Sequence, residues 1–558
     1  MSVASASVNA AREAGRTIDE LLARPRTVLG TLVGAQVAAT IVLALAVEHN
    51  GWVWFQGGDQ IENATTSWLM GRLELPPTIV GYVWPFVLAP ITWVTGPTYL
   101  QTLPPLVVLQ VLVLGPIALL CVYAIAARIG GRLLGYWAAL LWVVAPFATI
   151  PLFVDRYQER FAEQFLPQAL GLTAMPDFPS MVLLLVAALF VVRALSDGHV
   201  TDAALAGVLA GAAGGLKPPN YLFLAGALLA FAVARRWRHG VVFSALVLPS
   251  LLVLAFWKYR GLGDLPVLAL EHARLAAGSS PAVIDVDRYV EIDFDHWRVQ
   301  MDYLREFFWS ARVVQWAPFA GLLAVVRVRR GAIAALLAGW LAAFIVVKGF
   351  SPRADIQANT FWRLLMPAWP AYLLLFASIP LLVPTLARRL GERLRPPTSA
   401  PVRVQWVVVA GVLTLAVPFV AIAIASRIGP PDPPAIVQEF ENDTTILTPV
   451  DEAIVLQVEQ RGGAQRLTWS DPEWRGEVFY RVYRTDGADA DVLCVTEAKV
   501  AWNCFFRGTA LATTRDRELV DPSPAPSAIY RVGVGTNWAN DPEAGDVFVF
   551  SPAVRAAP

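Results

Sequence analysis

The chain has 558 residues, of which 56% are hydrophobic and only 16% are charged, and its 44 basic residues balance its 44 acidic ones. Soluble proteins carry about 25% charged residues, so this composition and a mean hydropathy of +0.53 exclude a set of ordinary soluble domains. The composition predicts a polytopic α-helical membrane protein.

Apolar runs recur along most of the chain, and about eleven of them reach or approach the roughly 20 residues that a membrane-spanning helix needs. Residues 1–27, which precede the first run, are expected to form either an amphipathic cytoplasmic segment at the lipid headgroups or a disordered tail. The expected spans are 28–48, 104–127, 133–150, 179–195, 202–216, 219–234, 241–258, 313–326, 331–347, 364–386 and 404–426.

Basic residues are segregated between the loops, which predicts the orientation. Every second loop is short and rich in Arg, and cytoplasmic loops retain Lys and Arg. The N-terminus is therefore expected inside, and the tail outside, an inner or plasma membrane. The first run has no small-residue cleavage site and is expected to be a signal anchor. The outer loops of the 28–427 membrane domain would be 49–103, 151–178, 259–312 and 348–363.

The first outer loop carries Asp59 directly after two glycines. The helical spacing of apolar residues from Ile61 to Leu73 predicts a short helix lying along the membrane interface, with Trp68 as an aromatic anchor. Asp59 would precede this helix, near its positive end, which favours an ionised carboxylate. Asp59 is then either an N-cap of the helix or a functional carboxylate.

The second outer loop has acidic residues at every fourth position, Asp155, Glu159 and Glu163. This spacing places them on one face of a helix, next to a face that carries Arg156 and Arg160. The pattern indicates either a solvated, ion-paired face or a second wall of a site that includes Asp59.

Lys217 stands alone between two apolar runs, in the segment Gly-Gly-Leu-Lys-Pro-Pro-Asn, with no acidic partner nearby in the sequence. A lysine in this position must extend to the interface, pair with a carboxylate or bind an anion. The two prolines that follow indicate a shaped backbone and favour the ligand interpretation.

Two further outer segments carry charged residues. The 259–312 segment is rich in acidic residues between 285 and 295 and predicts either a divalent-cation or sugar site or an acidic lid. The segment from 348 to 370 combines Lys348, Arg353 and Arg363 with aromatic residues and prolines. Arginine suits a phosphate, although an aromatic belt with interfacial cations explains the same composition.

From about residue 433 the apolar residues alternate with period two, which predicts an antiparallel β-sandwich over 433–558. The segments Leu-Thr-Trp, Tyr-Arg-Val-Tyr-Arg and Tyr-Arg-Val-Gly-Val resemble the fibronectin type III fold. Cys494 and Cys504 fall on neighbouring expected strands of this external domain, and we expect a disulfide between them. Cys121 lies within a span and is expected to be a free thiol.

Three short motifs in the membrane part resemble the GT-C superfamily, the polytopic glycosyltransferases that use polyprenyl-phosphate-linked sugars. They are Gly-Asp59-Gln, Gly-Gly-Leu-Lys217-Pro-Pro and Arg363-Leu-Leu-Met-Pro-Ala-Trp-Pro-Ala-Tyr. That superfamily includes protein mannosyltransferases, aminoarabinose transferases and arabinosyltransferases. The chain departs from the family pattern at Gln60, where a second acidic residue is common, and Glu62 follows two positions later.

The resemblance implies a transferase that moves a sugar from a polyprenyl-phosphate donor to an extracytoplasmic glycan, lipid or protein, with inversion. Asp59 would be the general base, assisted if at all by Asp155, Glu159 or Glu62. Lys217 and Arg363, with Arg353 and Lys348 in reserve, would bind the donor phosphate. A divalent cation is possible but not required. The alternatives are a lipid-linked glycan polymerase or ligase, and a flippase or transporter.

Overall fold

The structure is a computed structural model, and it describes most of the chain from residue 23 to residue 556. The described ranges are 23–46, 58–76, 80–262, 293–351, 354–356, 360–385, 399–428, 434–439, 445–474, 477–486, 493–494, 504–505, 509–536 and 545–556.

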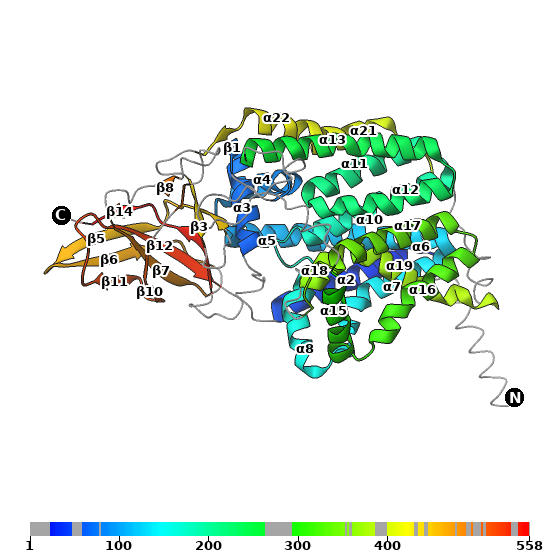
Figure 1. Ribbon diagram of the computed structural model, residues 1–558, viewed down its shortest axis with the longest axis horizontal. Helices are drawn as coiled ribbons and strands as arrows, with labels where there is room; N and C mark the ends of the chain where they lie inside the picture. The colour runs from blue at the N-terminus through cyan, green and yellow to red at the C-terminus, as the bar shows by residue number, and fades with distance from the viewer. Residues whose placement is uncertain are drawn as a thin grey trace.

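A bundle of long helices forms one part of the molecule, and a β-rich part lies at one end of it (Figure 1). The α-helices are α2 Pro25–Ala46, α3 Gly58–Gly71, α4 Val83–Thr95, α5 Tyr99–Leu109, α6 Gly115–Gly130, α7 Arg132–Ala148, α8 Asp155–Arg160, α9 Leu166–Ala169, α10 Asp177–Asp197, α11 Val200–Leu216, α12 Phe223–Val233, α13 Trp237–Leu262, α15 Phe294–Phe307, α16 Ala311–Arg327, α17 Gly331–Phe344, α18 Thr360–Leu365, α19 Trp369–Ser378, α21 Val404–Gly411 and α22 Val417–Ile424. Short π and 3₁₀ segments join or extend them: η1 Gln110–Leu114, η2 Ile150–Leu152, η3 Phe161–Phe165, η4 Pro218–Leu222, η5 Ile345–Gly349, η6 Met366–Ala368, η7 Ile379–Leu382 and η8 Val412–Ala416.

Each of the eleven predicted apolar runs overlaps one or more helices of the bundle, and the run at 104–127 covers α5, η1 and α6. Within the described ranges, seven helices are long and apolar enough to cross a membrane, and they make this an integral membrane protein. The helices that cover the runs at 133–150, 202–216 and 219–234 are shorter. Helix α4 is a further short apolar helix that the sequence analysis did not predict.

The C-terminal part contains the predicted β-sandwich strands. One sheet has the order β11-β6-β5 and another the order β10-β7-β12-β13, with β14 also paired to β12. A third sheet has the order β4-β3-β9-β8. It contains the neighbouring strands expected around Cys494 and Cys504, whereas β3 and β4 were not predicted. The strands are β3 Ala435–Glu439, β4 Thr445–Pro449, β5 Val455–Arg461, β6 Ala464–Ser470, β7 Phe479–Thr485, β8 Leu493–Cys494, β9 Cys504–Phe505, β10 Thr509–Thr514, β11 Glu518–Asp521, β12 Ile529–Thr536, β13 Asp546–Phe550 and β14 Val554–Arg555.

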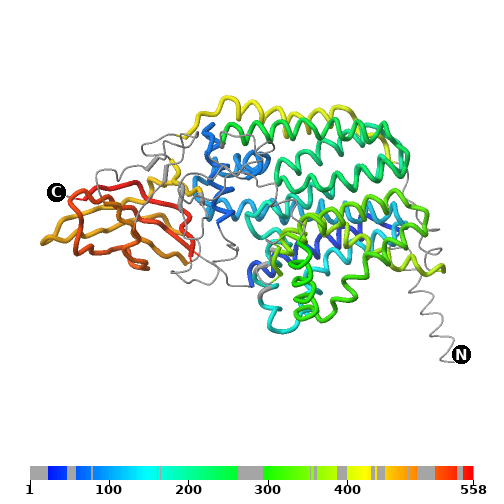
Figure 2. Tube along the Cα trace, in the orientation of Figure 1, coloured from blue at the N-terminus to red at the C-terminus, as the bar shows by residue number. Residues whose placement is uncertain are grey.

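Helix α3 connects the bundle to the sandwich, and its position corrects a prediction. The sequence predicts a helix on the membrane surface, whereas ten of the fourteen residues of α3 are buried. Leu69 packs with Ala435 and Leu447 of the β-rich part, and Trp68 lies against this contact. In the tube view α3 and α4 lie between the sandwich and the long helices (Figure 2). A sequence pattern cannot show this burial, because part of the cover of α3 comes from Ala435 and Leu447, more than 350 positions away.

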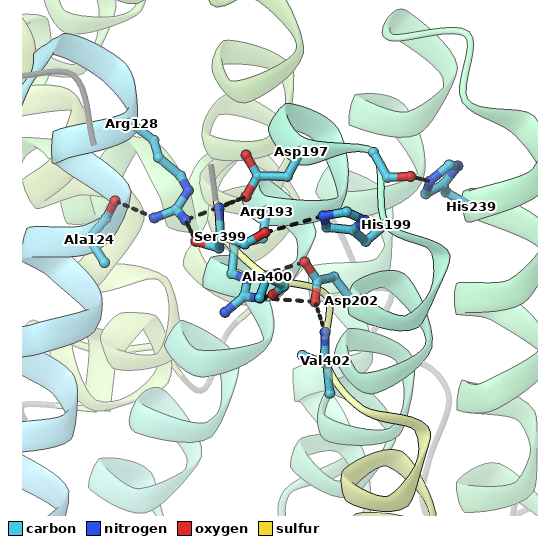
Figure 3. Close-up of polar contacts among 11 residues, drawn as sticks. Ala124, Arg128, Arg193, Asp197, His199, Asp202, His239, Ser399, Ala400 and Val402 are labelled. Carbon is cyan, nitrogen blue, oxygen red and sulfur yellow. Dashed lines mark hydrogen bonds and ion pairs between the residues drawn. The ribbon is translucent and has the colours of Figure 1, made fainter. Parts of the chain in front are cut away.

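The last span, Val404–Ile424, is fixed at both ends. At its C-terminal end, strand β2, Ser426–Arg427, pairs in parallel with β1, Glu74–Leu75, of the first outer loop. At the other end, the segment 399–402 is held by charged side chains of α6, α10 and α11 (Figure 3). Arg193 binds the fully buried Asp202 through two hydrogen bonds of 3.1 and 3.2 Å.

The same group of contacts holds the segment through its backbone. Asp202 accepts a hydrogen bond from the backbone N–H of Val402 (3.2 Å), and Arg193 donates one to the carbonyl of Ala400 (2.7 Å). His199 contacts the carbonyl of Ser399 at 3.2 Å. Two of the arginines that were used to predict the orientation, Arg128 and Arg193, are therefore paired with aspartates at this end of the bundle.

Candidate functional site

Four charged residues from four separate parts of the sequence meet at the end of the bundle that faces the sandwich. The Arg363 guanidinium donates from Nη2 to Oδ2 of Asp59 and from Nε to Oδ2 of Asp177, the second at 3.2 Å. Lys217 Nζ donates to Oδ1 of Asp177. Together they form one continuous chain of ion pairs, Asp59–Arg363–Asp177–Lys217, which we call the charged chain.

Local sequence places Lys217 at this point. A residue before proline is restricted to extended conformations, and Lys217 has φ −142° and ψ 109°, so α11 ends there. The preceding glycines allow close packing, because a Cβ on Gly215 would lie 2.5 Å from the Tyr82 ring and one on Gly214 would lie 2.2 Å from Tyr221. The Gly-Gly-Leu-Lys-Pro-Pro motif thus fixes the lysine where the first outer loop crosses the end of α11.

Asp177 and Arg363, two further members of the charged chain, lie in the first turn of a long helix and in a short helix, respectively. Asp177 is the first residue of α10, where the partial positive charge of the helix terminus favours a carboxylate. Arg363 lies in the short helix α18, which Pro367 follows in η6. A proline cannot continue a regular α-helix, so the backbone changes course after α18 and α19 begins at Trp369.

Burial differs along the charged chain. The Asp177 side chain is 0% exposed and binds both cations, whereas the Asp59 side chain at the end of the chain is 51% exposed. The Arg363 guanidinium lowers the pKa of the Asp59 carboxyl below its ordinary value, burial opposes this shift, and Lys217 adds to it. Asp177 is therefore the fixed counter-ion of the two cations, and Asp59 is the carboxylate that solvent or a ligand reaches.

The structure brings together three of the predicted site residues, Asp59, Lys217 and Arg363. Of the three alternatives for Lys217, the structure shows pairing with a carboxylate, and the partner, Asp177, is 40 positions away in the sequence. Asp177 was not among the predicted site residues. A carboxylate between two prolines, at the start of a span and with no nearby base, was the signal that could have identified it.

The remaining predicted residues lie elsewhere or outside the described ranges. Glu62 is buried on α3 and attracts Lys258 of α13. Asp155 and Glu159 are exposed on α8, which packs against α15 through a hydrogen bond of 2.9 Å from Val154 N to Phe307 O. Lys348 is buried in η5, while Arg353 lies outside the described residues.

The acidic segment that predicted a cation site is only partly described, since residues 263–292 lie outside the described ranges. Asp293 caps α15 by accepting from the His296 backbone N–H at 2.9 Å, and His296 Nε2 lies 2.8 Å from the Ala354 carbonyl oxygen. In the part of the chain that the structure describes, no group of three or more His, Cys, Asp or Glu side chains is placed to hold a metal ion.

An apolar groove with a volume of about 600 Å³ is lined in part by α18, the short helix that carries Arg363. Phe361, Trp362 and Leu365, which flank Arg363 in the sequence, line one wall of the groove. The other walls come from α15, α16 and α17, and include Met301, Phe319 and Leu341. The groove therefore offers an aromatic and aliphatic surface next to the arginine.

No family model matches the chain, and no curated protein matches it. The solved structures that resemble it include three of the Archaeoglobus fulgidus oligosaccharyltransferase. The match to the apo form has 12% identity and a TM-score of 0.38, and it covers 73% of this chain and 56% of the oligosaccharyltransferase chain. The match to the form named AglB, in complex with an inhibitory peptide and a dolichol-phosphate, has 14% identity and a TM-score of 0.41. It covers 72% of this chain and 56% of the AglB chain.

The third structure, the complex with Zn and sulfate, has 14% identity and a TM-score of 0.41, and covers 73% of this chain and 54% of its own. This chain thus spans about half the length of these structures. The similarity concerns the arrangement of the chain in space.

Proposed function

We propose that this protein is a GT-C type glycosyltransferase that moves a hexosyl or pentosyl group from a polyprenyl-phosphate donor to a glycan, lipid or protein acceptor. Asp59 is the only general base, and the reaction inverts the anomeric carbon. The active site and the sandwich lie on the extracytoplasmic side. The observation that carries this proposal is the charged chain, which joins a half-exposed carboxylate to two cations held by a buried one.

The reaction needs a base for the acceptor and cations for the leaving group. The acceptor hydroxyl gives its proton to the Asp59 carboxylate while its oxygen attacks the anomeric carbon. The bond from that carbon to the phosphate oxygen breaks, and polyprenyl phosphate leaves with the electron pair. Lys217 and Arg363 stabilise the negative charge that develops on the phosphate.

Arg363 donates a hydrogen bond to Asp59 in the structure. A carboxylate paired with arginine has a depressed pKa and is a weak base. A donor phosphate that binds Arg363 competes with Asp59 for the guanidinium, which frees the carboxylate and raises its pKa. Because Asp177 holds both cations from the buried side, they stay in place during this exchange.

The apolar groove accommodates the isoprenoid chain of the donor. Residues that flank Arg363 in the sequence line the groove, which supports placing the isoprenoid chain there when the donor phosphate binds Arg363. Burying a hydrocarbon chain contributes about 0.8 kcal/mol per CH₂ group. The sandwich, of fibronectin type III kind, would bind the acceptor or a partner in the cell envelope.

Replacing Arg363 with Gln tests the donor site. The KM for the donor is expected to rise by about 10- to 100-fold, since charge-assisted hydrogen bonds contribute roughly 1.5–3 kcal/mol each. The measurement is transfer of radiolabelled sugar from polyprenyl phosphate by the purified protein in liposomes. Arg156→Gln is the matched control, because Arg156 forms an exposed ion pair with Glu306. Equal donor KM values for wild type and Arg363→Gln would remove Arg363 from the donor site.

Cys494 and Cys504 are expected to form a disulfide in the extracytoplasmic sandwich. The two residues are directly opposite each other in the antiparallel pair β8–β9, and the Cα atoms of opposite residues lie about 4.5–5.5 Å apart, within the range that a disulfide spans. Alkylation of the denatured protein without reductant should label one of the three cysteines, Cys121, and alkylation after reduction should label all three. Labelling of all three without reductant would contradict the disulfide.

A further inference from the structure

Residues 172–176, which lead into Asp177, form an irregular buried segment. Thr173, Ala174 and Met175 are each only 1% exposed, yet they lie in no helix or strand. Buried backbone N–H and C=O groups need hydrogen-bond partners, and here side chains supply them. Gln110 Nε2 donates to the Thr173 carbonyl at 2.7 Å, and Trp84 Nε1 donates to the Ala174 carbonyl at 3.3 Å.

The third of these side chains comes from α3, directly after the proposed base. Gln60 Oε1 accepts a hydrogen bond of 2.6 Å from the backbone N–H of Ala174. The Gln60 side chain is 0% exposed, so water does not compete for this bond. Neighbouring residues of a helix point about 100° apart. The first turn of α3 therefore presents Asp59 to Arg363 and Gln60 to the segment before Asp177.

Resting on the proposed function, we propose that Gln60 is a positioning residue, which fixes the Asp59 carboxylate relative to Asp177 by binding the Ala174 N–H. Arg363 contacts both carboxylates through different nitrogens, and this requires a defined separation of α3 from α10. A misplacement of about 1 Å at a reacting group can lower a rate by about 100-fold. The bond from Ala174 to Gln60 links the two helices three residues before Asp177 and so sets the separation of α3 from the start of α10.

The neutral amide also preserves the charge balance of the site. Asp59 and Asp177 are matched by Lys217 and Arg363, so a carboxylate at position 60 would add a third negative charge beside them. A glutamate has the same length as glutamine and still accepts from the Ala174 N–H. Any kcat that Gln60→Glu recovers relative to Gln60→Met therefore reports the acceptor, and the loss that remains relative to wild type reports the added charge.

The test compares Gln60→Met, which keeps the volume but removes the strong acceptor, with Gln60→Glu, which keeps the acceptor. Gln60→Met is expected to lower kcat by about 10- to 100-fold and to leave the donor KM within about twofold. The acid limb of the pH profile of kcat/KM should shift to higher pH in this variant. Asp59 then lies farther from Arg363 and Lys217, which lower its pKa, so the pKa rises. Gln60→Glu should recover part of kcat relative to Gln60→Met, because it restores the acceptor but adds a buried negative charge.

Gln110→Met is the matched control, because it removes a bond to the same segment from an element that carries none of the charged chain. It should lower thermal stability while the acid limb stays at the wild-type pH. Equal effects of Gln60→Met and Gln110→Met on kcat and on the acid limb would overturn the positioning role, and so would a wild-type kcat for Gln60→Met. If Gln60→Met does not fold, Gln60→Asn replaces it, because the asparagine side chain is one methylene shorter and its acceptor does not reach Ala174. A wild-type kcat for Gln60→Asn, or effects equal to those of Gln110→Met, would then overturn the positioning role.

Asp59→Asn separates the two proposals. An inactive Asp59→Asn together with a wild-type Gln60→Met refutes only the positioning role. A fully active Asp59→Asn refutes the base itself, whatever Gln60→Met does.

Discussion

Replacing Asp59 with Asn is expected to lower the rate of sugar transfer by about 100- to 10,000-fold, the usual contribution of a general base. Asparagine keeps the shape of the side chain but cannot accept the proton of the acceptor hydroxyl. The protein should still fold, because Asp59 is the half-exposed end of the charged chain and Asp177 continues to hold both cations. The measurement is transfer of radiolabelled sugar from polyprenyl phosphate in liposomes.

Asp155→Asn is the matched control for this substitution. Asp155 is exposed at the start of α8, and its carboxylate accepts a hydrogen bond of 3.3 Å from Gln158. Its removal should change transfer by less than about twofold, since contacts of exposed charges contribute little. If both variants retained full transfer, Asp59 would not be the base. If both lost it, α8 would belong to the active site.

Replacing Asp177 with Asn is expected to destabilise the protein by about 3–5 kcal/mol, the usual result of removing one partner of a buried ion pair. The Asp177 carboxylate is fully buried and binds Lys217 and Arg363. In the variant, both cations lose their buried counter-ion and only Asp59 remains for them. The measurement is thermal unfolding of the purified protein in detergent, with and without donor.

Two further variants test whether charge is the cause. Asp302→Asn removes one partner of an exposed pair with Arg305 and should change stability by less than about 1 kcal/mol. Adding Lys217→Met to Asp177→Asn removes the uncompensated cation and should recover part of the lost stability. An Asp177→Asn protein as stable as the wild type would show that the two cations do not depend on Asp177.

The helices were predictable because they depend on local composition. The run at 404–426 is apolar throughout and is helical from Val404 to Ile424, with a short π segment in the middle. The strands around Trp469 and Tyr530 were likewise predictable from alternation. The number of membrane crossings is harder to predict, since helices such as α11 and α12 are too short for their length alone to decide.

The site was predictable only in part, because its contacts are between distant residues. Asp59, Lys217 and Arg363 were identified from their unusual positions and from a family resemblance. Asp177 was missed because its partners lie 40 and 186 positions away. The burial of α3 was missed for the same reason, since an amphipathic pattern shows that one face is covered but not by what.

Helix α3 belongs to two hydrophobic clusters at once, because Ile61 packs in the bundle and Leu69 packs with Ala435 and Leu447. A shortened chain that ends before residue 433 would leave Leu69 uncovered and would loosen the helix that carries Asp59. Loss of transfer in such a truncation would therefore say nothing about acceptor recognition by the sandwich. The role of the sandwich is therefore better tested by point substitutions on its far side than by deleting it.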